Sequence, residues 1–141
     1  MKKLCAFLMV CASAMGFCFA ETWKNLKEAE KHCMQIVEDF SDGNFQHAVD
    51  MLKTYTIIVP SAMDNLVVQA TEQWALITDN YGKKLDVRLL DTDKESDCLV
   101  KYTHLVRMEK YPLVFETILY KNDEGWVVIN FQFNDTIINL F

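Results

Sequence analysis

Glycine and proline are scarce in this sequence, which has four glycines and two prolines among 141 residues. Loops that cradle phosphate groups need several closely spaced glycines, and a serine nucleophile elbow needs a glycine on each side of the serine. Neither pattern occurs in the chain. The sequence therefore carries no common nucleotide-binding or serine-hydrolase signature.

Basic residues are also few. Without Lys2 and Lys3, which belong to the predicted leader described below, 12 Lys and Arg stand against 20 Asp and Glu, a net charge of −8 with neutral histidines. Nucleic acids and anionic membranes are bound by clusters of Lys and Arg, and no such cluster is visible. We therefore predict no nucleic-acid partner, and no membrane partner once the leader is removed.

Spacings typical of metal sites are absent as well. No Cys-x-x-Cys pair occurs, and neither His32 nor His47 has a second histidine four residues further on. The acidic residues of 91–97 follow the alternate positions of a calcium loop, but the glycine and the final glutamate of such a loop are missing. We predict no metal and no cofactor, and a solvated charged turn at 91–97.

The first twenty residues have the pattern of a secretory signal peptide. Lys2 and Lys3 form a basic start, Leu4 to Phe19 carries no charge, and Cys18-Phe19-Ala20 offers small residues at the two positions that a signal peptidase reads. A retained anchor is the alternative, because the apolar run of about 16 residues is only slightly shorter than the roughly 20 that span a bilayer. We predict cleavage after Ala20, one mature domain over residues 21–141, and export from a bacterial cell to the periplasm or the medium.

Two cysteines, Cys33 and Cys98, remain when the leader is set aside. An even number in an exported protein permits one disulfide, which would stabilise the fold by about 4 kcal/mol for a loop of this length. Two separate buried thiols are the alternative. Sequence spacing does not decide between them, because it does not place the two Cα atoms.

Three helices are expected in the first half of the mature chain, because apolar residues recur there with helical spacing. The predicted helices cover residues 23–40, 45–52 and 61–81. Thr22 and Ser61 are the expected N-caps of the first and third helices, while Gly43 and Gly82 end them. The segment 54–60 is β-branched and stops at a proline, which indicates an extended connector.

The second half of the chain predicts antiparallel strands. Its runs of β-branched and aromatic residues are separated by turn residues at 91–97, 109–112 and 122–125. The predicted strands cover residues 85–89, 98–108, 113–120 and 126–133. Because a helix with one apolar stripe must bury that stripe, we predict an α+β fold in which three helices pack on a curved antiparallel sheet of about four strands.

The last hairpin allows a prediction of register. If residues 123–125 form a three-residue loop with Gly125 in the left-handed conformation, each residue of 116–122 finds its partner in 126–132. The expected pairs are then Asn122 with Trp126, Tyr120 with Val128, Ile118 with Asn130 and Glu116 with Gln132. A four-residue loop would change the partners. In either register both faces carry large apolar side chains, so the face without helices is predicted to bind a second copy or a partner.

Short motifs occupy fixed places among these elements: Gly43-Asn44-Phe45 after the first helix, Trp74 and Tyr81-Gly82 in the third, and Gly125-Trp126 in the last hairpin. In this order they resemble the nuclear transport factor 2-like, or cystatin-like cone, superfamily, especially its secreted bacterial members of unknown function. The resemblance implies a cone whose helices and concave sheet face enclose a pocket, often with dimerisation through the sheet. It implies no activity, since the superfamily includes enzymes and non-catalytic domains and the catalytic pattern of its isomerases is not matched here.

Two residues are candidates for acid–base chemistry. A histidine at 104 inside a cone could act as a general base near neutral pH, and the alternative is a strand histidine with satisfied hydrogen bonds. Glu116 lies in an apolar strand: facing a pocket, its pKa would rise on burial, whereas facing an edge or solvent it would only prevent further strand pairing. The predicted pocket residues are Tyr102, His104, Glu116, Trp126, Asn130 and Gln132.

Two functions of different classes follow. The first prediction is a non-enzymatic exported binding or interaction domain, homodimeric through its sheet, with a pocket for a small apolar or amphipathic ligand. The alternative is a small isomerase or lyase of the cone type, in which His104 or Glu116 transfers a proton.

Overall fold

The computed structural model describes residues 20–141, and in this range three helices precede a four-stranded antiparallel sheet. The elements are α2 (Leu26–Ser41), α3 (Phe45–Thr54), α4 (Pro60–Tyr81), β1 (Lys84–Glu95), β2 (Leu99–Met108), β3 (Leu113–Lys121), β4 (Trp126–Asn134) and the short 3-10 helix η1 (Ile138–Leu140). The predicted leader lies outside the described residues, apart from Ala20. Within the described range no helix combines the length and the apolarity that a bilayer crossing requires.

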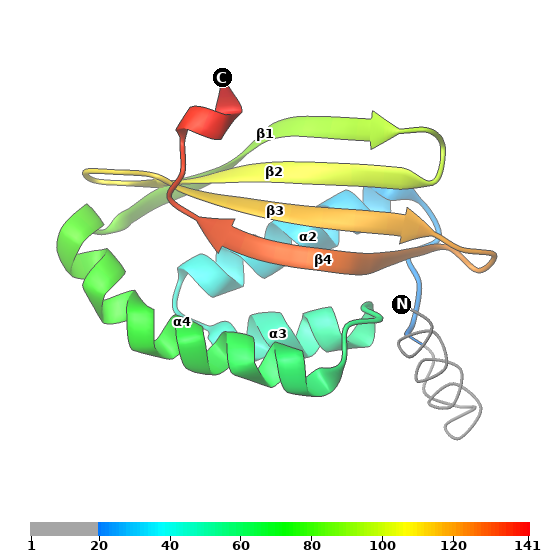
Figure 1. Ribbon diagram of the computed structural model, residues 1–141, viewed down its shortest axis with the longest axis horizontal. Coiled ribbons are helices and arrows are strands. Elements are labelled where there is room, and N and C mark those ends of the chain that lie inside the picture. The colour runs from blue at the N-terminus through cyan, green and yellow to red at the C-terminus, as the bar shows by residue number, and fades with distance from the viewer. Residues whose placement is uncertain (1–19) are drawn as a thin grey trace, which may run out of the picture.

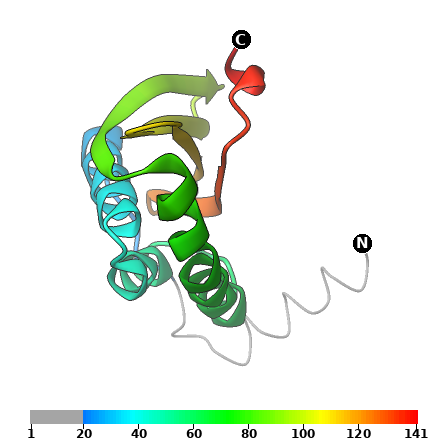
Figure 2. The same ribbon diagram turned by 90° about the vertical axis from the view of Figure 1, so that its left-hand side faces the viewer.

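The helices and the sheet form two layers (Figures 1 and 2). The strands follow one another in the order β1-β2-β3-β4, and each pair is antiparallel. Figure 2 shows α2 against one face of a strongly curved sheet, with α3 and α4 continuing the helical layer, while the chain after β4 crosses the opposite face. We call these the helix face and the outer face of the sheet. The predicted α+β architecture is confirmed.

The first helix begins later than predicted. Its N-cap is Asn25, whose side chain accepts a hydrogen bond from the amide of Glu28 at 2.9 Å, and not Thr22. The residues before it are extended because Trp23 pairs with Trp126 at the start of β4, through backbone bonds of 3.0 and 2.8 Å. Pairing of the two backbones at this point prevents an earlier helical turn.

The third helix begins at Pro60, with Val59 as the N-cap, so the predicted cap at Ser61 is wrong. Proline suits the first helical turn, because its missing N–H would have no intrahelical acceptor there. The connector before it is extended, as predicted. Thr56 forms an isolated bridge with Val128, and its hydroxyl donates to the carbonyl oxygen of Val128 at 2.7 Å.

The charged segment 91–97 is mostly strand and not the predicted turn. β1 continues to Glu95, and Asp93 is paired with Lys101 of β2. The turn to β2 is confined to residues 96–98, where Ser96 has a φ of 62°. Acidic side chains that alternate with Thr92 and Lys94 fit an exposed strand, because every second residue points to the same side.

The last hairpin combines both of the registers considered above. Lys121 pairs with Trp126, which gives a four-residue loop, so the predicted partners of Trp126 and Val128 are wrong. One extra residue in β4, Ile129, then forms a bulge, beyond which the predicted pairs Ile118–Asn130 and Glu116–Gln132 are present. Because of this bulge, Trp126 and Val128 lie on the helix face together with Phe131 and Phe133.

Phe40 of α2 is the centre of the core. It is fully buried, and its ring lies 5.0 Å from Phe45 of α3 and 5.4 Å from Phe115 of β3, both edge-on. Phe131 and Phe133 of β4 complete the cluster at 5.9 and 5.1 Å. One side chain therefore joins two helices to two strands.

Replacing Phe40 by alanine tests this role. We expect the free energy of unfolding to fall by about 3–5 kcal/mol, because the change leaves a cavity where two layers meet. Denaturant unfolding followed by circular dichroism measures the loss. The control is Leu76→Ala on α4, where the side chain is 64% exposed and the expected change is within about 0.5 kcal/mol. Similar losses for the two variants would contradict the central place of Phe40.

Candidate functional site

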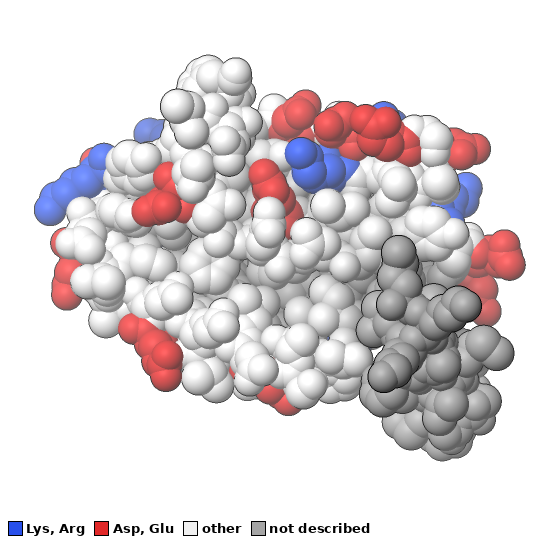
Figure 3. Space-filling view, viewed as in Figure 1, with Lys and Arg blue, Asp and Glu red and all other residues white. Residues whose placement is uncertain are grey.

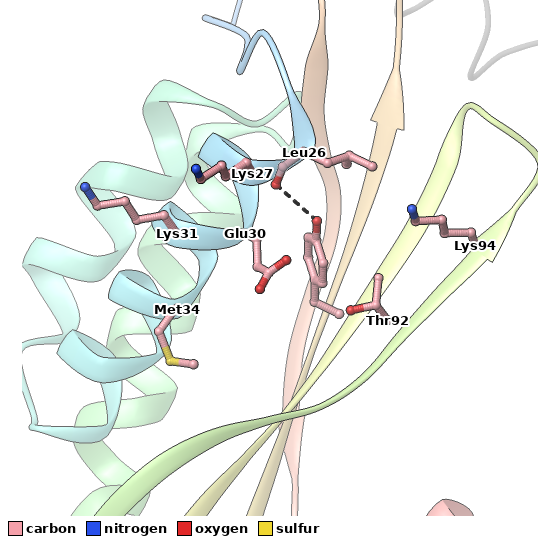
Figure 4. Close-up of a pocket in the computed structure, with 8 residues that line it drawn as sticks. Leu26, Lys27, Glu30, Lys31, Met34, Thr92 and Lys94 are labelled. Carbon is pink, nitrogen blue, oxygen red and sulfur yellow. Dashed lines mark hydrogen bonds between the residues drawn. The ribbon is translucent and has the colours of Figure 1, made fainter.

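A groove of about 480 Å³ opens between the first half of α2 and the end of the sheet that carries the β1–β2 turn. Its lining residues are Leu26, Lys27, Glu30, Lys31 and Met34 of α2, Thr92 and Lys94 of β1, and Tyr102 of β2. Figure 4 shows Glu30 and Met34 on α2, with Thr92 and Lys94 across from them on β1, and Thr92 is the cross-strand partner of Tyr102. The side chains of Lys27 and Lys31 point away from β1 and form the outer rim of the groove.

The shape of β1 accounts for the opening. Leu89 pairs with His104 and Asp91 with Thr103, which leaves Leu90 as an extra residue in a second β-bulge. A bulge bends its strand and increases the local twist. The strong curvature of β1 is visible in Figure 2. The distal half of β1 therefore carries Thr92 and Lys94 as a wall facing α2.

Tyr102 forms the floor of the groove. Only 1% of the residue is exposed, and its hydroxyl donates to the carbonyl oxygen of Leu26 at 3.3 Å. Burial raises the pKa of Tyr102, and the nearby Cys33 and Glu30 add to the rise. The phenol is therefore neutral at physiological pH and holds the first turn of α2 to the sheet by a long hydrogen bond.

His104 lies behind Tyr102, with 6.4 Å between the ring centroids. It is fully buried, and neither ring nitrogen has a hydrogen-bond partner among the described residues. The hydroxyl of Thr117, on the neighbouring strand, is likewise buried and unpartnered. Burial lowers the pKa of His104 to about 4, so the imidazole is neutral near pH 7. The core next to Tyr102 thus contains three polar atoms without hydrogen-bond partners, on His104 and Thr117, and the imidazole there is uncharged.

The six predicted pocket residues do not come together. Tyr102, His104 and Trp126 lie on the helix face, whereas Glu116, Asn130 and Gln132 lie on the outer face. The reason is the strand alternation: Glu116 pairs with Thr103, the neighbour of His104, and so points to the other side. There the side-chain amide of Gln132 donates to the Glu116 carboxylate at 2.8 Å.

Cys33 and Cys98 are free cysteines in the structure, which corresponds to the alternative without a disulfide. Cys33 is fully buried in α2, and burial raises the pKa of its thiol. Cys98 lies in the turn before β2, with its sulfur 3.2 Å from the hydroxyl of Ser96. Across residues 20–141 no group of three His, Cys, Asp or Glu side chains is arranged to hold a metal ion.

Most of the groove residues were not among the sequence candidates. The signal for them was a second stripe on α2, since Leu26, Glu30 and Met34 follow one another at four-residue intervals beside the fully buried stripe that contains Cys33 and Phe40. The contribution of β1 had no comparable signal. Thr92 and Lys94 belong to a segment that the sequence predicted as a turn.

Comparison with known proteins identifies the fold. No family model matches the sequence, and no curated protein matches it. A solved structure described as an NTF2-like transpeptidase, from Campylobacter jejuni, is 15% identical and covers 72% of this chain and 97% of its own, with a TM-score of 0.54. A DUF4783 family protein from Bacteroides uniformis is 12% identical and covers 72% of this chain and 94% of its own, with a TM-score of 0.45.

The buried imidazole predicts a dependence of stability on pH. In the unfolded chain His104 binds a proton near its ordinary pKa of 6.5, but in the folded chain only near 4. Above pH 6.5, His104 is neutral in both the folded and the unfolded chain and does not lower the free energy of unfolding. As the pH falls toward 4, the unfolded chain binds the proton and the free energy of unfolding falls by roughly 3 kcal/mol. We expect His104→Leu, which removes the two unpartnered nitrogens, to unfold with a shallower dependence on pH over this range.

Urea unfolding at a series of pH values measures the difference between the two proteins. The control is Leu76→Ala, since Leu76 is exposed on α4 and its replacement removes no titratable group, so the pH profile should stay close to that of the unchanged protein. Equal profiles for the unchanged protein and His104→Leu would show that His104 binds protons equally well in both states.

Proposed function

From the nuclear transport factor 2-like fold of this chain, we propose that the protein is an exported, non-enzymatic binding domain that acts as a homodimer. Its ligand is a small amphipathic molecule, held in the groove between α2 and the β1–β2 end of the sheet. Folds of this kind serve many activities, so the proposal rests on the groove and not on the fold alone.

The observation that carries the proposal is the composition of the groove. Leu26, Met34 and Tyr102 give it an apolar floor, while Glu30 and Lys94 supply charge at its sides. Ligand sites in proteins are typically concavities of about 300–1,000 Å³ with mainly apolar walls and a few polar groups that orient the ligand. The volume of about 480 Å³ lies within that range.

The arrangement of polar groups supports binding over catalysis. A proton-transfer site needs an acid or a base within hydrogen-bond reach of the substrate, and usually a second group that orients it. His104 is sealed behind Tyr102 without a polar partner, and Glu116 lies on the opposite face of the sheet. No observation favours the isomerase or lyase alternative.

The outer face of the sheet supports the dimer. Figure 3 shows few charged side chains over its middle, where β3 and β4 run. Tyr120 is 42% exposed on this face, and the segment that crosses it ends in Ile138 and Phe141, which are 79% and 100% exposed. An exposed apolar surface of this kind is stabilised when a second copy covers it.

Titration with decanoate tests the ligand site. We expect the amide NMR signals of the first half of α2 and of the distal half of β1 to shift. Met34→Glu places a charge on the apolar floor and should weaken binding by about tenfold. The matched control is Val68→Glu, because Val68 is 53% exposed on α4, outside the groove. Shifts elsewhere only, or equal affinity for the two variants, would contradict the proposed site.

Sedimentation velocity tests the dimer. The unchanged protein should sediment as a dimer, and Tyr120→Glu as a monomer, because the new carboxylate would be desolvated in the interface. Leu76→Glu is the control, since it changes an exposed apolar residue on the helical layer and should remain dimeric. A monomeric unchanged protein at all concentrations would rule out this part of the proposal.

A further inference from the structure

The two edges of the sheet differ. β4 is covered at its start, where Trp23 and Thr56 pair with it. Within residues 20–141, β1 pairs with β2 alone, and none of the backbone hydrogen bonds outside the strand ladders involves residues 85–95. A strand with unpaired amide and carbonyl groups is a template for a further strand.

The regular part of this edge is its distal half. Beyond the bulge at Leu90, Asp91 to Glu95 pair with Thr103 to Leu99 without interruption, and all five edge residues are exposed. Asp91, Asp93 and Glu95 point to the outer face, in line with the outer-facing residues of β2 that they pair with. Figure 3 shows the acidic side chains gathered over this end of β1. These three carboxylates give the outer-facing side of this edge a negative charge.

The other side of the same half-strand faces the groove. Thr92 and Lys94 alternate with the acidic residues and line the groove opposite Glu30 and Met34 of α2. A chain added to β1 would therefore present one set of its side chains to three carboxylates and the other set to an apolar concavity. Strand addition obtains affinity from main-chain bonds and specificity from such pockets for alternate side chains.

We propose that the distal half of β1 binds an extended polypeptide segment in which basic and apolar side chains alternate. The segment pairs with Asp91–Glu95 as a fifth strand, its basic side chains lie beside the three carboxylates, and an apolar side chain enters the groove. This inference rests on the proposed binding function of the groove and names its partner as a peptide.

The charge of the edge selects this partner over a second copy of the chain. Antiparallel pairing of two β1 edges about Asp93 would set Asp93 against Asp93 and Asp91 against Glu95. Like charges directly opposite each other destabilise a strand pair, whereas opposite charges contribute favourably. The same three carboxylates that prevent self-association thus favour a basic strand.

Four synthetic peptides, two of them methylated versions of the first, test the proposal. The first, Lys-Val-Lys-Leu-Lys-Val-Lys, has the proposed alternation. The second has the same composition in blocks, Lys-Lys-Lys-Lys-Val-Leu-Val. The other two are versions of the first peptide with methylated backbone nitrogens, one at the odd and one at the even residues. Because alternate amides of a strand point to opposite edges, only one of these two versions loses the donors that would pair with β1. We expect the alternating peptide to bind at least about tenfold more tightly than the block peptide, and one methylated version to lose binding.

Amide NMR shifts and hydrogen exchange locate the peptide. The amides of residues 91–95 that face the free edge should gain protection. The triple change Asp91→Asn, Asp93→Asn and Glu95→Gln should weaken binding by about tenfold, since each opposite-charge pair contributes a factor of a few. The matched control is Lys101→Gln on the outer face of β2, which should not weaken it.

The outcomes distinguish the peptide proposal from the proposed function of the groove. Equal binding of the alternating and block peptides, or indifference to backbone methylation, would mean attraction by charge alone and would overturn strand addition. Decanoate binding in the groove without peptide binding would overturn this inference and leave the proposed function intact. Failure of both ligands at the groove would overturn both.

Discussion

The packing of α2 on the curved sheet is the interaction on which the rest of the molecule depends. Phe40 joins this helix to α3, β3 and β4, and Cys33, Ile36 and Val37 continue the contact as fully or almost fully buried residues. Near the other end of α2, Tyr102 holds the helix by one long hydrogen bond. The helix is therefore held by aromatic packing around Phe40 and, beside the groove, by the buried Tyr102.

Two of the three register shifts in the sheet, at Ile129 and at Leu90, give it its functional asymmetry. The bulge at Ile129 turns Trp126 and Val128 toward the helices, where they complete the core beside the extended segment that contains Trp23. The bulge at Leu90 lies in β1, which is an edge strand among the described residues, and it separates the exposed distal half of β1 from the half that packs on the core. One irregularity thus closes the fold, and the other opens the surface that we propose binds a partner.

His104 and Thr117 show what the fold tolerates in its interior. Buried polar groups are nearly always hydrogen-bonded, because an unpartnered one costs about 1–3 kcal/mol. Here three polar atoms lie unpartnered behind Tyr102, in the part of the core closest to the groove. Their cost is offset by the large aromatic cluster around Phe40.

The sequence by itself determined the fold class, the order of the elements and the amphipathic face of α2, because periodicity in hydrophobic residues reports which residues are buried together. The sequence also predicted the hairpin at Gly125. The structure adds a second reason for glycine there, since a Cβ would lie 2.5 Å from the carbonyl oxygen of Trp23. Tertiary contacts decided the late start of α2, the bulges at Leu90 and Ile129, and the separation of Glu116 from His104. A bulge depends on what its strand must meet elsewhere in the fold, and shifting one residue reverses every side chain beyond it, so no local pattern could assign the groove or the free edge of β1.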